Sequence, residues 1–336
     1  MLAAEFEGEG KLSIKDKKAP EIKNANDVKL KVEVASICGS DLHILATPPT
    51  HPAEPNIIQG HEYIGEVVEK GRGVSSLNVG DRVIVDPTVV CGSCYYCQNG
   101  EKNICENFST IGIFEDGGWA EYSVVPSQNT FKISKDVPAE IAVLAEPLSC
   151  VVSGNEKLQT KPGDKVVVLG AGPMGQLFTQ ILKATGAGTI IVVDFSEYRL
   201  NYAITSGATH TINPNDNNVE EVINSLTNIG ADIVIDCVGS LFDQSINLVR
   251  KGGKVLLVGM NENSNKPIHQ FKITQNEIKV MGTIIQNNKF PTVIKILESG
   301  ILNLEKLITH KVKLKDIHEG IEIMKTGNAI KILVYP

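Results

Sequence analysis

The chain has 336 residues, of which 42% are apolar and 21% are charged, and its formal net charge is −7. This composition is ordinary for a globular protein, and the length predicts two domains. An acidic balance gives no electrostatic reason to expect nucleic-acid or membrane partners, and no apolar run reaches the roughly 18 residues that a membrane span needs.

The beginning of the chain, "MLAAEFEGEGKLSIKDKKAP", lacks the apolar core of a secretory signal peptide. We therefore expect a cytoplasmic protein. In that reducing compartment, thiols are more often used for metal binding or catalysis than for a disulfide framework.

Residues 28–126 contain short apolar runs such as "VKLKVEV", "DRVIV" and "AEYSVV", which are interrupted by Gly, Pro and Asn. This pattern is typical of small antiparallel strands joined by irregular loops. The first half of the chain is therefore predicted to be a β-rich barrel.

Two segments of this half carry side chains that bind metals. "ICGSDLH" supplies Cys38, Ser40, Asp41 and His43, and "QGHEYIG" supplies His61 and Glu62. A thiolate, an imidazole and a carboxylate from separate segments can form a catalytic zinc site if one coordination position stays open. Each residue alone would more often be an ordinary core or surface group, so only the combination is informative.

The segment "CGSCYYCQNGEKNIC" holds Cys91, Cys94, Cys97 and Cys105 in a polar loop. An iron–sulfur cluster is disfavoured, because seven residues precede the fourth cysteine and Glu106, rather than Pro, follows it. With a single lysine and no arginine, the loop does not resemble a nucleic-acid-binding module. Four thiolates would fill a tetrahedral zinc site completely, so we expect a structural zinc without chemistry.

Residues 165–285 contain buried strand patterns, among them "KVVVLG", "TIIVVD", "ADIVIDCVG" and "GGKVLLVGM", separated by helical or polar segments. Alternation of this kind predicts a parallel sheet with helices on both faces, so the fold class is α/β. Two helices and a last strand, "AIKILVYP", are expected after residue 285, and we expect this tail to return to the first domain.

A glycine motif follows the first of these strands. Gly170, Gly172 and Gly175 spell G-x-G-x-x-G, and the next strand ends in Asp194, nineteen residues further on. This is the arrangement in which a dinucleotide pyrophosphate meets a helix N-terminus and an acid binds the ribose hydroxyls. It predicts binding of NAD. The other residues expected to contact the cofactor are Pro173, Met174, Arg199, Val258 and Gly259.

These motifs together resemble the zinc-dependent medium-chain alcohol dehydrogenases, and most closely their polyol branch of sorbitol and threonine dehydrogenase-like proteins. The family signature is matched by Gly60, His61, Glu62, Gly65, Gly71 and Val74. The resemblance implies a GroES-like catalytic domain at residues 1–150 with residues 286–336 returning to it, and a Rossmann domain of doubly wound parallel sheet at 151–285. It also implies an interdomain cleft for substrate and a homotetramer or homodimer.

The resemblance implies two zinc ions per chain. Cys38 and His61 match the near-invariant ligands of the catalytic zinc, and Glu146 in "LAEPLSC" matches a third ligand of the polyol branch. Glu62 can also coordinate or act in catalysis, and Cys150 is a rival for the third position. Ser40 is similar to the first proton acceptor and His43 to the group that passes the proton to solvent, while Asp41 is expected to form a supporting ion pair.

The family's reaction transfers a hydride between NAD(H) and an alcohol or ketone, and the substrate expected here is a secondary alcohol or polyol. Sorbitol dehydrogenases carry an Arg-Tyr pair where this chain has Ile284 and Ile285, which makes a sugar polyol less certain; an apolar pocket of Ile44, Phe114, Trp119 and Ile284 is expected instead. L-Threonine and phosphorylated polyols remain alternatives. A non-catalytic zinc and nucleotide-binding scaffold is a hypothesis of a different class.

Overall fold

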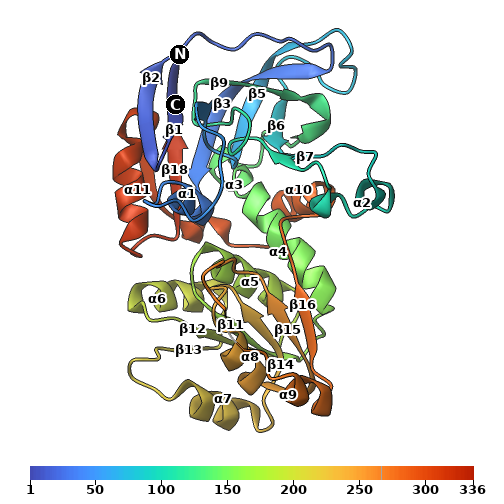
Figure 1. Cartoon of the computed structure of the whole chain (residues 1–336), viewed down its shortest axis with the longest axis vertical. Coiled ribbons are helices and arrows are strands. Elements are labelled where there is room, and N and C mark those ends of the chain that lie inside the picture. The colour runs from blue at the N-terminus through green and yellow to red at the C-terminus, as the bar shows by residue number, and fades with distance from the viewer. Residues whose placement is uncertain (266) are drawn as a thin grey trace. The chain divides into compact units, whose positions relative to one another are not determined.

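The computed structural model describes residues 1–265 and 267–336. Two compact units are formed, and each contains a sheet (Figure 1). The first unit comprises Met1–Pro147, Asn287–Gly300 and Ile308–Pro336, and the second comprises Leu148–Gln286 and Ile301–Leu307.

The segment Ile301–Leu307 belongs to the second unit, whereas the sequence predicts that residues 286–336 all return to the first domain. The reason is local packing within the second unit. Leu304 and Leu307 are buried, their turn contacts helix α6 (Glu197–Ser206), and the carbonyl of Asn303 accepts a hydrogen bond from Gln180 Nε2 at 3.0 Å.

The first unit is built mainly from antiparallel strands in three sheets. The largest has the order β10-β6-β5-β3-β18-β17, with β9 also paired to β3; the others are β2-β1-β4 and β7-β8. Their bounds are β1 Leu2–Gly8, β2 Lys11–Asp16, β3 Asp27–Ile37, β4 Ile57–Ile58, β5 Tyr63–Lys70, β6 Arg82–Val85, β7 Thr88–Val89, β8 Ser109–Thr110, β9 Tyr122–Pro126, β10 Thr130–Lys132, β17 Ile308–Lys313 and β18 Lys331–Tyr335.

Helices complete this unit, and one of them continues into the second. They are α1 Gly39–Ile44, α2 Tyr95–Gln98, α3 Ala139–Ala142, α4 Ala145–Leu158, α10 Phe290–Ser299 and α11 Ile317–Lys325. The two helices and the last strand expected in the tail are confirmed as α10, α11 and β18. Strand β17 and the β1–β2 hairpin were not expected, because their alternation is short and interrupted by charged side chains.

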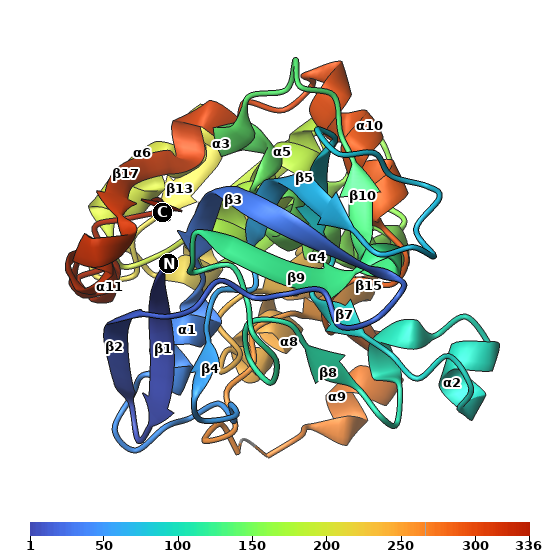
Figure 2. The same ribbon diagram turned by 90° about the horizontal axis from the view of Figure 1, so that it is seen from above.

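Strand β3 is the centre of the first unit, and it pairs with β5, β9 and β18. Figure 2 shows it beside β9. Its sequence alternates apolar with charged residues, so that Val28, Leu30 and Val32 point into the core while Lys29 and Lys31 do not. The same alternation places the end of the strand, and therefore Cys38, at the edge of the buried interior.

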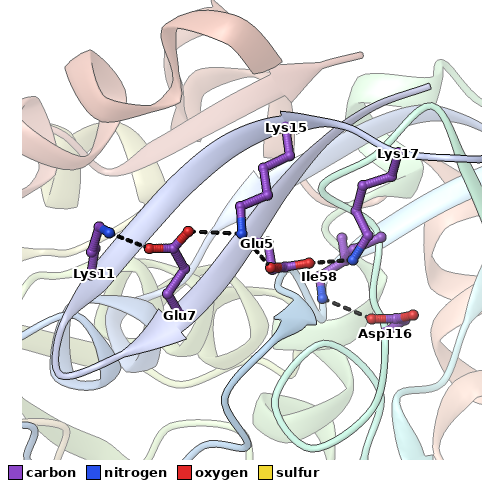
Figure 3. Close-up of polar contacts among 7 residues, drawn as sticks. All are labelled: Glu5, Glu7, Lys11, Lys15, Lys17, Ile58 and Asp116. Atoms are coloured by element: carbon purple, nitrogen blue, oxygen red, sulfur yellow. Dashed lines mark hydrogen bonds and ion pairs between the residues drawn. The ribbon is translucent and has the colours of Figure 1, made fainter.

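A ladder of charges covers the β1–β2 edge (Figure 3). Lys15 Nζ contacts Glu5 at 2.7 Å and Glu7 at 2.8 Å, Lys17 pairs with Glu5, and Lys11 pairs with Glu7. Such charged side chains at a strand edge discourage pairing with the sheet of another molecule.

The second unit is a six-stranded parallel sheet of order β13-β12-β11-β14-β15-β16. Helices α5 and α6 contact each other on one face, and α7 and α8 contact each other on the other (Figure 1). The bounds are β11 Lys165–Leu169, β12 Thr189–Val193, β13 His210–Ile212, β14 Ala231–Asp236, β15 Val249–Leu257, β16 Lys279–Gly282, α5 Pro173–Ala184, α6 Glu197–Ser206, α7 Val219–Thr227, α8 Phe242–Leu248 and α9 Gln270–Gln275.

This sheet confirms the predicted α/β fold class. The chain begins at the central strand β11, builds outward to β13, and then returns to build β14, β15 and β16 on the other side. The strand order thus reverses beside β11, and ligands of such sheets bind at the carboxyl ends of the strands at this point. The glycine motif starts there, directly after Leu169. Within the described residues, no helix is long and apolar enough to cross a membrane.

Candidate metal and cofactor sites

The four cysteines of the loop converge in space. Their sulfur atoms all lie within 4.8 Å of one another, with 3.8 Å between Cys94 Sγ and Cys105 Sγ and 3.5 Å between Cys105 Sγ and Cys91 Sγ. Four sulfurs about 2.3 Å from a tetrahedral zinc are about 3.8 Å apart, so this set fits zinc closely.

The loop also prepares two of these thiols for deprotonation. Backbone N–H groups of Ser93 and Cys94 donate to Cys91 and lower the pKa of its thiol to about 5, and backbone donors likewise lower the pKa of Cys94. By contrast, burial and the neighbouring thiols raise the pKa of Cys97 to about 12. Four close thiols cannot all ionise without a cation, which is further support for a metal here.

A second group of possible ligands lies in the first unit. Cys38 follows the end of β3 and is the N-cap residue before helix α1, whereas His61 and Glu62 directly precede β5, the neighbour of β3. One ligand atom from each of the three residues lies within 4.8 Å of the other two, and both His61 and Glu62 are buried. Adjacent strands therefore bring together residues that are more than 20 positions apart.

Asp41 contacts two of these three residues, Cys38 and His61. Its Oδ2 accepts a hydrogen bond from the Cys38 backbone N–H at 2.8 Å, and its Oδ1 lies 3.5 Å from His61 Nδ1, an ion-pair distance. Burial opposes protonation of His61, but the negative charges of Asp41 and Cys38 outweigh it and raise the pKa of the imidazole well above its usual value. With Nδ1 directed to Asp41, His61 Nε2 is left for a ligand, the arrangement typical of metal-binding histidines.

Glu62 is held at one of its two oxygens. Ser36 Oγ donates to Glu62 Oε2, and Lys331 Nζ forms an ion pair with the same oxygen, whereas the buried Oε1 has no hydrogen-bond partner among the described residues. A buried carboxylate oxygen without a donor fits a site that takes up a cation. Sequence reasoning did not identify Ser36 or Lys331; the one available signal was a lysine within the apolar strand "AIKILVYP".

The remaining predicted residues differ in burial and in their contacts. Glu146 is buried in the first turn of α4, but it does not belong to the set of ligand atoms within 4.8 Å, and neither does Cys150. Ser40 Oγ lies 3.3 Å from His61 Nε2, while the exposed His43 shares a hydrogen bond of 2.9 Å with Thr50 Oγ1.

The expected apolar pocket is wrong in part. Trp119 and Ile44 have no exposed surface and belong to the core of the first unit, where the indole Nε1 of Trp119 donates to the Ser36 carbonyl at 3.2 Å. Side chains enclosed in this way do not line a surface pocket. Phe114 packs at the margin of the same core, and Ile284 is partly exposed on the second unit.

The glycine loop of the second unit has a tight backbone and one open position. Gly170 has a φ of +96°, and a Cβ at Gly175 would lie 1.9 Å from the Gly170 carbonyl oxygen, so packing requires both glycines. At Gly172, in contrast, a Cβ would meet nothing closer than Arg199 Nη1 at 3.9 Å. The space beside Gly172 at the N-terminus of α5, with Pro173 and Met174 in its first turn, fits a phosphate group.

Asp194 lies at the end of β12, beside this loop. Its Oδ2 accepts from the Ala171 N–H at 2.7 Å and its Oδ1 from the Ser196 N–H at 2.8 Å. The carboxylate therefore braces the loop, and each oxygen keeps further acceptor capacity for a ribose hydroxyl. Arg199 lies in the first turn of α6, with its guanidinium close to Gly172 and its buried Nε without a partner among the described residues.

Asp236 gives the other side of the sheet a similar arrangement, which the sequence analysis missed. It ends β14, and its carboxylate accepts hydrogen bonds from the N–H groups of Val238, Gly239 and Leu241 at 2.8 to 3.0 Å. Its backbone carbonyl accepts from Val258 and Gly259, which places these two predicted residues beside the next strand end. The signal was an acid closing the apolar strand "ADIVID", as Asp194 follows "TIIVV".

Comparison with known proteins gives the family. Residues 24–135 match the alcohol dehydrogenase GroES-like domain, and residues 173–299 match the zinc-binding dehydrogenase domain. The chain is 37% identical to an L-threonine 3-dehydrogenase of Pyrococcus furiosus, with 91% of this chain and 90% of that protein covered. It is 33% identical to a sorbitol dehydrogenase of Halalkalibacterium halodurans, with 98% and 97% covered.

A solved structure of similar architecture is a zinc-binding dehydrogenase from Sinorhizobium meliloti bound to NADP. It has a TM-score of 0.94 and 31% identity, and the match covers 100% of this chain and 99% of that one. The chain therefore belongs to the zinc-dependent medium-chain alcohol dehydrogenases. It is an oxidoreductase of the alcohol and polyol dehydrogenase class.

The two candidate metal sites should differ in how firmly they hold zinc. We predict two zinc ions per purified chain, and loss of the one at Cys38 and His61 first on dialysis against a chelator, since four thiolates leave no position for an attacking ligand. Elemental analysis combined with thiol titration measures both. One zinc per chain with the thiols of Cys91 to Cys105 reactive would contradict the assignment of the loop.

Substitutions should separate the sites by their effects. Cys38→Ser is expected to lower turnover by more than about a hundredfold in a folded protein, because even residues behind metal ligands contribute about 10–100-fold. Cys94→Ser should instead lower the melting temperature. Cys150→Ser is the matched control and should retain the second zinc; its loss in this variant would make Cys150 a ligand.

Proposed function

We propose that this protein catalyses the NAD-dependent oxidation of a secondary alcohol or polyol, and the reverse reduction of the ketone, at a zinc held by the first unit. The observation that carries the proposal is the convergence of Cys38, His61 and Glu62 within 4.8 Å. A structural metal would need a closed set, but this group offers three protein ligand atoms and so leaves a position for substrate.

In this proposal Cys38 Sγ and His61 Nε2 bind the metal directly. A carboxylate supplies the third protein ligand, and both Glu62 and Glu146 are candidates; the convergence above favours Glu62, whereas the motif around Glu146 favours the latter. When bound there, zinc would supply a Lewis acid for the substrate oxygen, and NAD would supply the hydride acceptor. Asp41 Oδ1, 3.5 Å from His61 Nδ1, orients the imidazole through charge.

Proton transfer is assigned to Ser40 and His43. Ser40 Oγ lies 3.3 Å from His61 Nε2, the atom assigned to the metal, so it is close enough to take a proton from an alcohol bound beside it. His43 lies three residues further along α1 and is exposed, so its imidazole can exchange protons with water. In ketone reduction the same groups return the proton.

NAD, rather than NADP, is the proposed cofactor. The pyrophosphate would lie at the N-terminus of α5 beside Gly172, with the Asp194 carboxylate accepting from the ribose hydroxyls. A 2′-phosphate would meet that charge at close range. Two like charges about 4 Å apart cost on the order of 1 kcal/mol in water and about 4 kcal/mol at an effective dielectric constant near 20. The proposal thus differs from the Sinorhizobium protein, which is bound to NADP.

For the substrate, a secondary alcohol or polyol is favoured by two facts. Relatives of similar length are a sorbitol dehydrogenase and an L-threonine 3-dehydrogenase. By the family resemblance, Ile284 and Ile285 replace the Arg-Tyr pair of sorbitol dehydrogenases, which favours a less polar secondary alcohol over a sugar polyol. L-Threonine is the second candidate, because that relative shares 37% of its residues with this chain. A phosphorylated polyol is the third candidate.

We also propose a cytoplasmic homotetramer or homodimer. Apolar side chains are exposed on the cysteine loop at Tyr95 and Ile104, and on and beside the edge strand β16 at Val280 and Ile284. Exposed apolar groups at a loop tip and at an open sheet edge are typical of surfaces that a second copy covers.

The charge of Asp194 should decide the cofactor preference. Wild-type protein is expected to prefer NAD by roughly tenfold to a thousandfold, at about 1.4 kcal/mol per decade. Asp194→Asn, which keeps one acceptor oxygen for the loop, should narrow this ratio mainly by improving NADP binding. The exposed Asp216→Asn is the control and should leave the ratio unchanged. Equal catalytic efficiency of the wild-type protein with both cofactors would contradict the assignment.

A substrate panel tests the reaction itself. Reduced-nicotinamide absorbance is followed at fixed NAD with 2,3-butanediol, sorbitol, L-threonine and a sugar-alcohol phosphate, and we expect the highest kcat/KM for a diol or polyol with a secondary hydroxyl. His61→Ala should abolish the signal. Preference for L-threonine would establish the second candidate. Binding of zinc and NAD without turnover of any class of alcohol would favour a non-catalytic scaffold.

A further inference from the structure

Lys331 is a lysine in the interior of the first unit. It begins β18, its side chain is only 3% exposed, and among the residues that the structure describes no other lysine and no arginine is buried to this degree. Burial of an ammonium group costs several kcal/mol unless anions compensate for it, so its neighbours must be negatively charged.

Those neighbours are the candidate metal ligands. Lys331 Nζ pairs with Glu62 Oε2, and the charges of Cys38 and Glu146 also act on it. The ammonium is therefore the fixed positive charge of the cluster.

The strand pairing fixes this contact. Strand β18 is antiparallel to β3, with Leu333 opposite Ser36 and Ile332 opposite Ile37, so Lys331 is held beside the end of β3. Ser36 Oγ donates to the same oxygen, Glu62 Oε2, while Oε1 has no donor. Two groups from neighbouring strands thus hold one half of the carboxylate and leave the other half without a partner.

We propose that Lys331 is a positioning residue that restrains Glu62 and supplies, before the metal binds, the positive charge that zinc later provides. This inference depends on the proposed zinc site. Zinc then enters a cluster that already contains one cation. Lys331 therefore weakens the binding of zinc and limits how closely the Glu62 carboxylate approaches the metal. The consequence is an exchangeable position on the metal, which substrate needs.

An ordinary supporting residue would behave in the opposite way. Removal of a group that merely orients a ligand weakens metal binding, by about 10–100-fold. Removal of the Lys331 charge, which also releases Glu62 Oε2, should instead strengthen metal binding. The sign of the change therefore distinguishes the two roles.

The test measures zinc affinity without cofactor, substrate or turnover. Full-length protein with the cysteine loop loaded and the second site empty is titrated with zinc against a chromophoric chelator. Lys331→Met, which keeps the length and removes the charge, is expected to lower Kd by on the order of tenfold. Its melting temperature should fall more in the zinc-depleted protein than in the loaded one. An unchanged or higher Kd overturns the proposal.

Three variants make the result specific. In a Glu62→Gln background, Lys331→Met should change Kd much less, because the carboxylate that it restrains is gone. Lys311→Met on the neighbouring strand β17 removes an exposed lysine paired with Glu140 and should leave Kd unchanged. Ser36→Ala removes the other donor to Glu62 Oε2 and should also lower the Kd for zinc. If Lys331→Met does not fold, the Kd of Ser36→Ala tests the proposal in its place.

Cobalt(II) provides a second readout. In Co(II)-substituted Lys331→Met, closer approach of the released Glu62 carboxylate to the metal should alter the visible absorption bands relative to wild type, and Lys331→Arg should restore the wild-type bands. Identical spectra would count against the restraint of Glu62. If wild-type protein binds no second zinc, the proposed function fails; if it does and Kd is unchanged in Lys331→Met and Ser36→Ala, only this inference fails.

Discussion

The antiparallel pairing of β18 with β3 is the constraint on which the first unit depends. Strand β3 lies near the beginning of the chain and β18 at its end, so their contact joins both ends of the sequence in one sheet. It also holds the buried Lys331 beside the end of β3, where its side chain pairs with the buried Glu62. A charge taken out of water in this way needs its partner at close range, and only the correct register provides it.

The two metal sites show two ways of assembling ligands. The four cysteines lie within fifteen residues of one loop, so a local fold and the metal together are sufficient to form their site. Cys38, His61 and Glu62 lie next to the ends of two paired strands, β3 and β5, so the distances between them depend on the whole sheet. The first site should therefore tolerate changes in the core that disturb the second.

In the second unit, an aspartate at the end of a parallel strand binds the backbone of the following loop at two places. Asp194 and Asp236 each accept backbone N–H groups of the loop that follows their strand, Asp194 from Ser196 and Asp236 from Val238. Asp194 also reaches across to Ala171 in the glycine loop. One carboxylate thereby connects two strand ends, so the loop that would receive a pyrophosphate is already shaped before a cofactor arrives.

Much of this was determined by the sequence alone. Cysteine spacing, the glycine motif followed by an acid, and buried strand runs are local patterns, because each depends on residues close together in the chain. They were sufficient for the fold class, the family and the candidate ligands. The order of the parallel strands was not among these predictions and came from the structure.

Only the tertiary structure decided the rest. Lys331 and Ser36 carry no motif, and they come to Glu62 from positions 269 and 26 residues away. The enclosure of Trp119 and the return of Ile301–Leu307 to the second unit are likewise products of packing. The physical reason is that burial and the pairing of buried charges depend on which strands become neighbours, and residue spacing along the chain does not specify that.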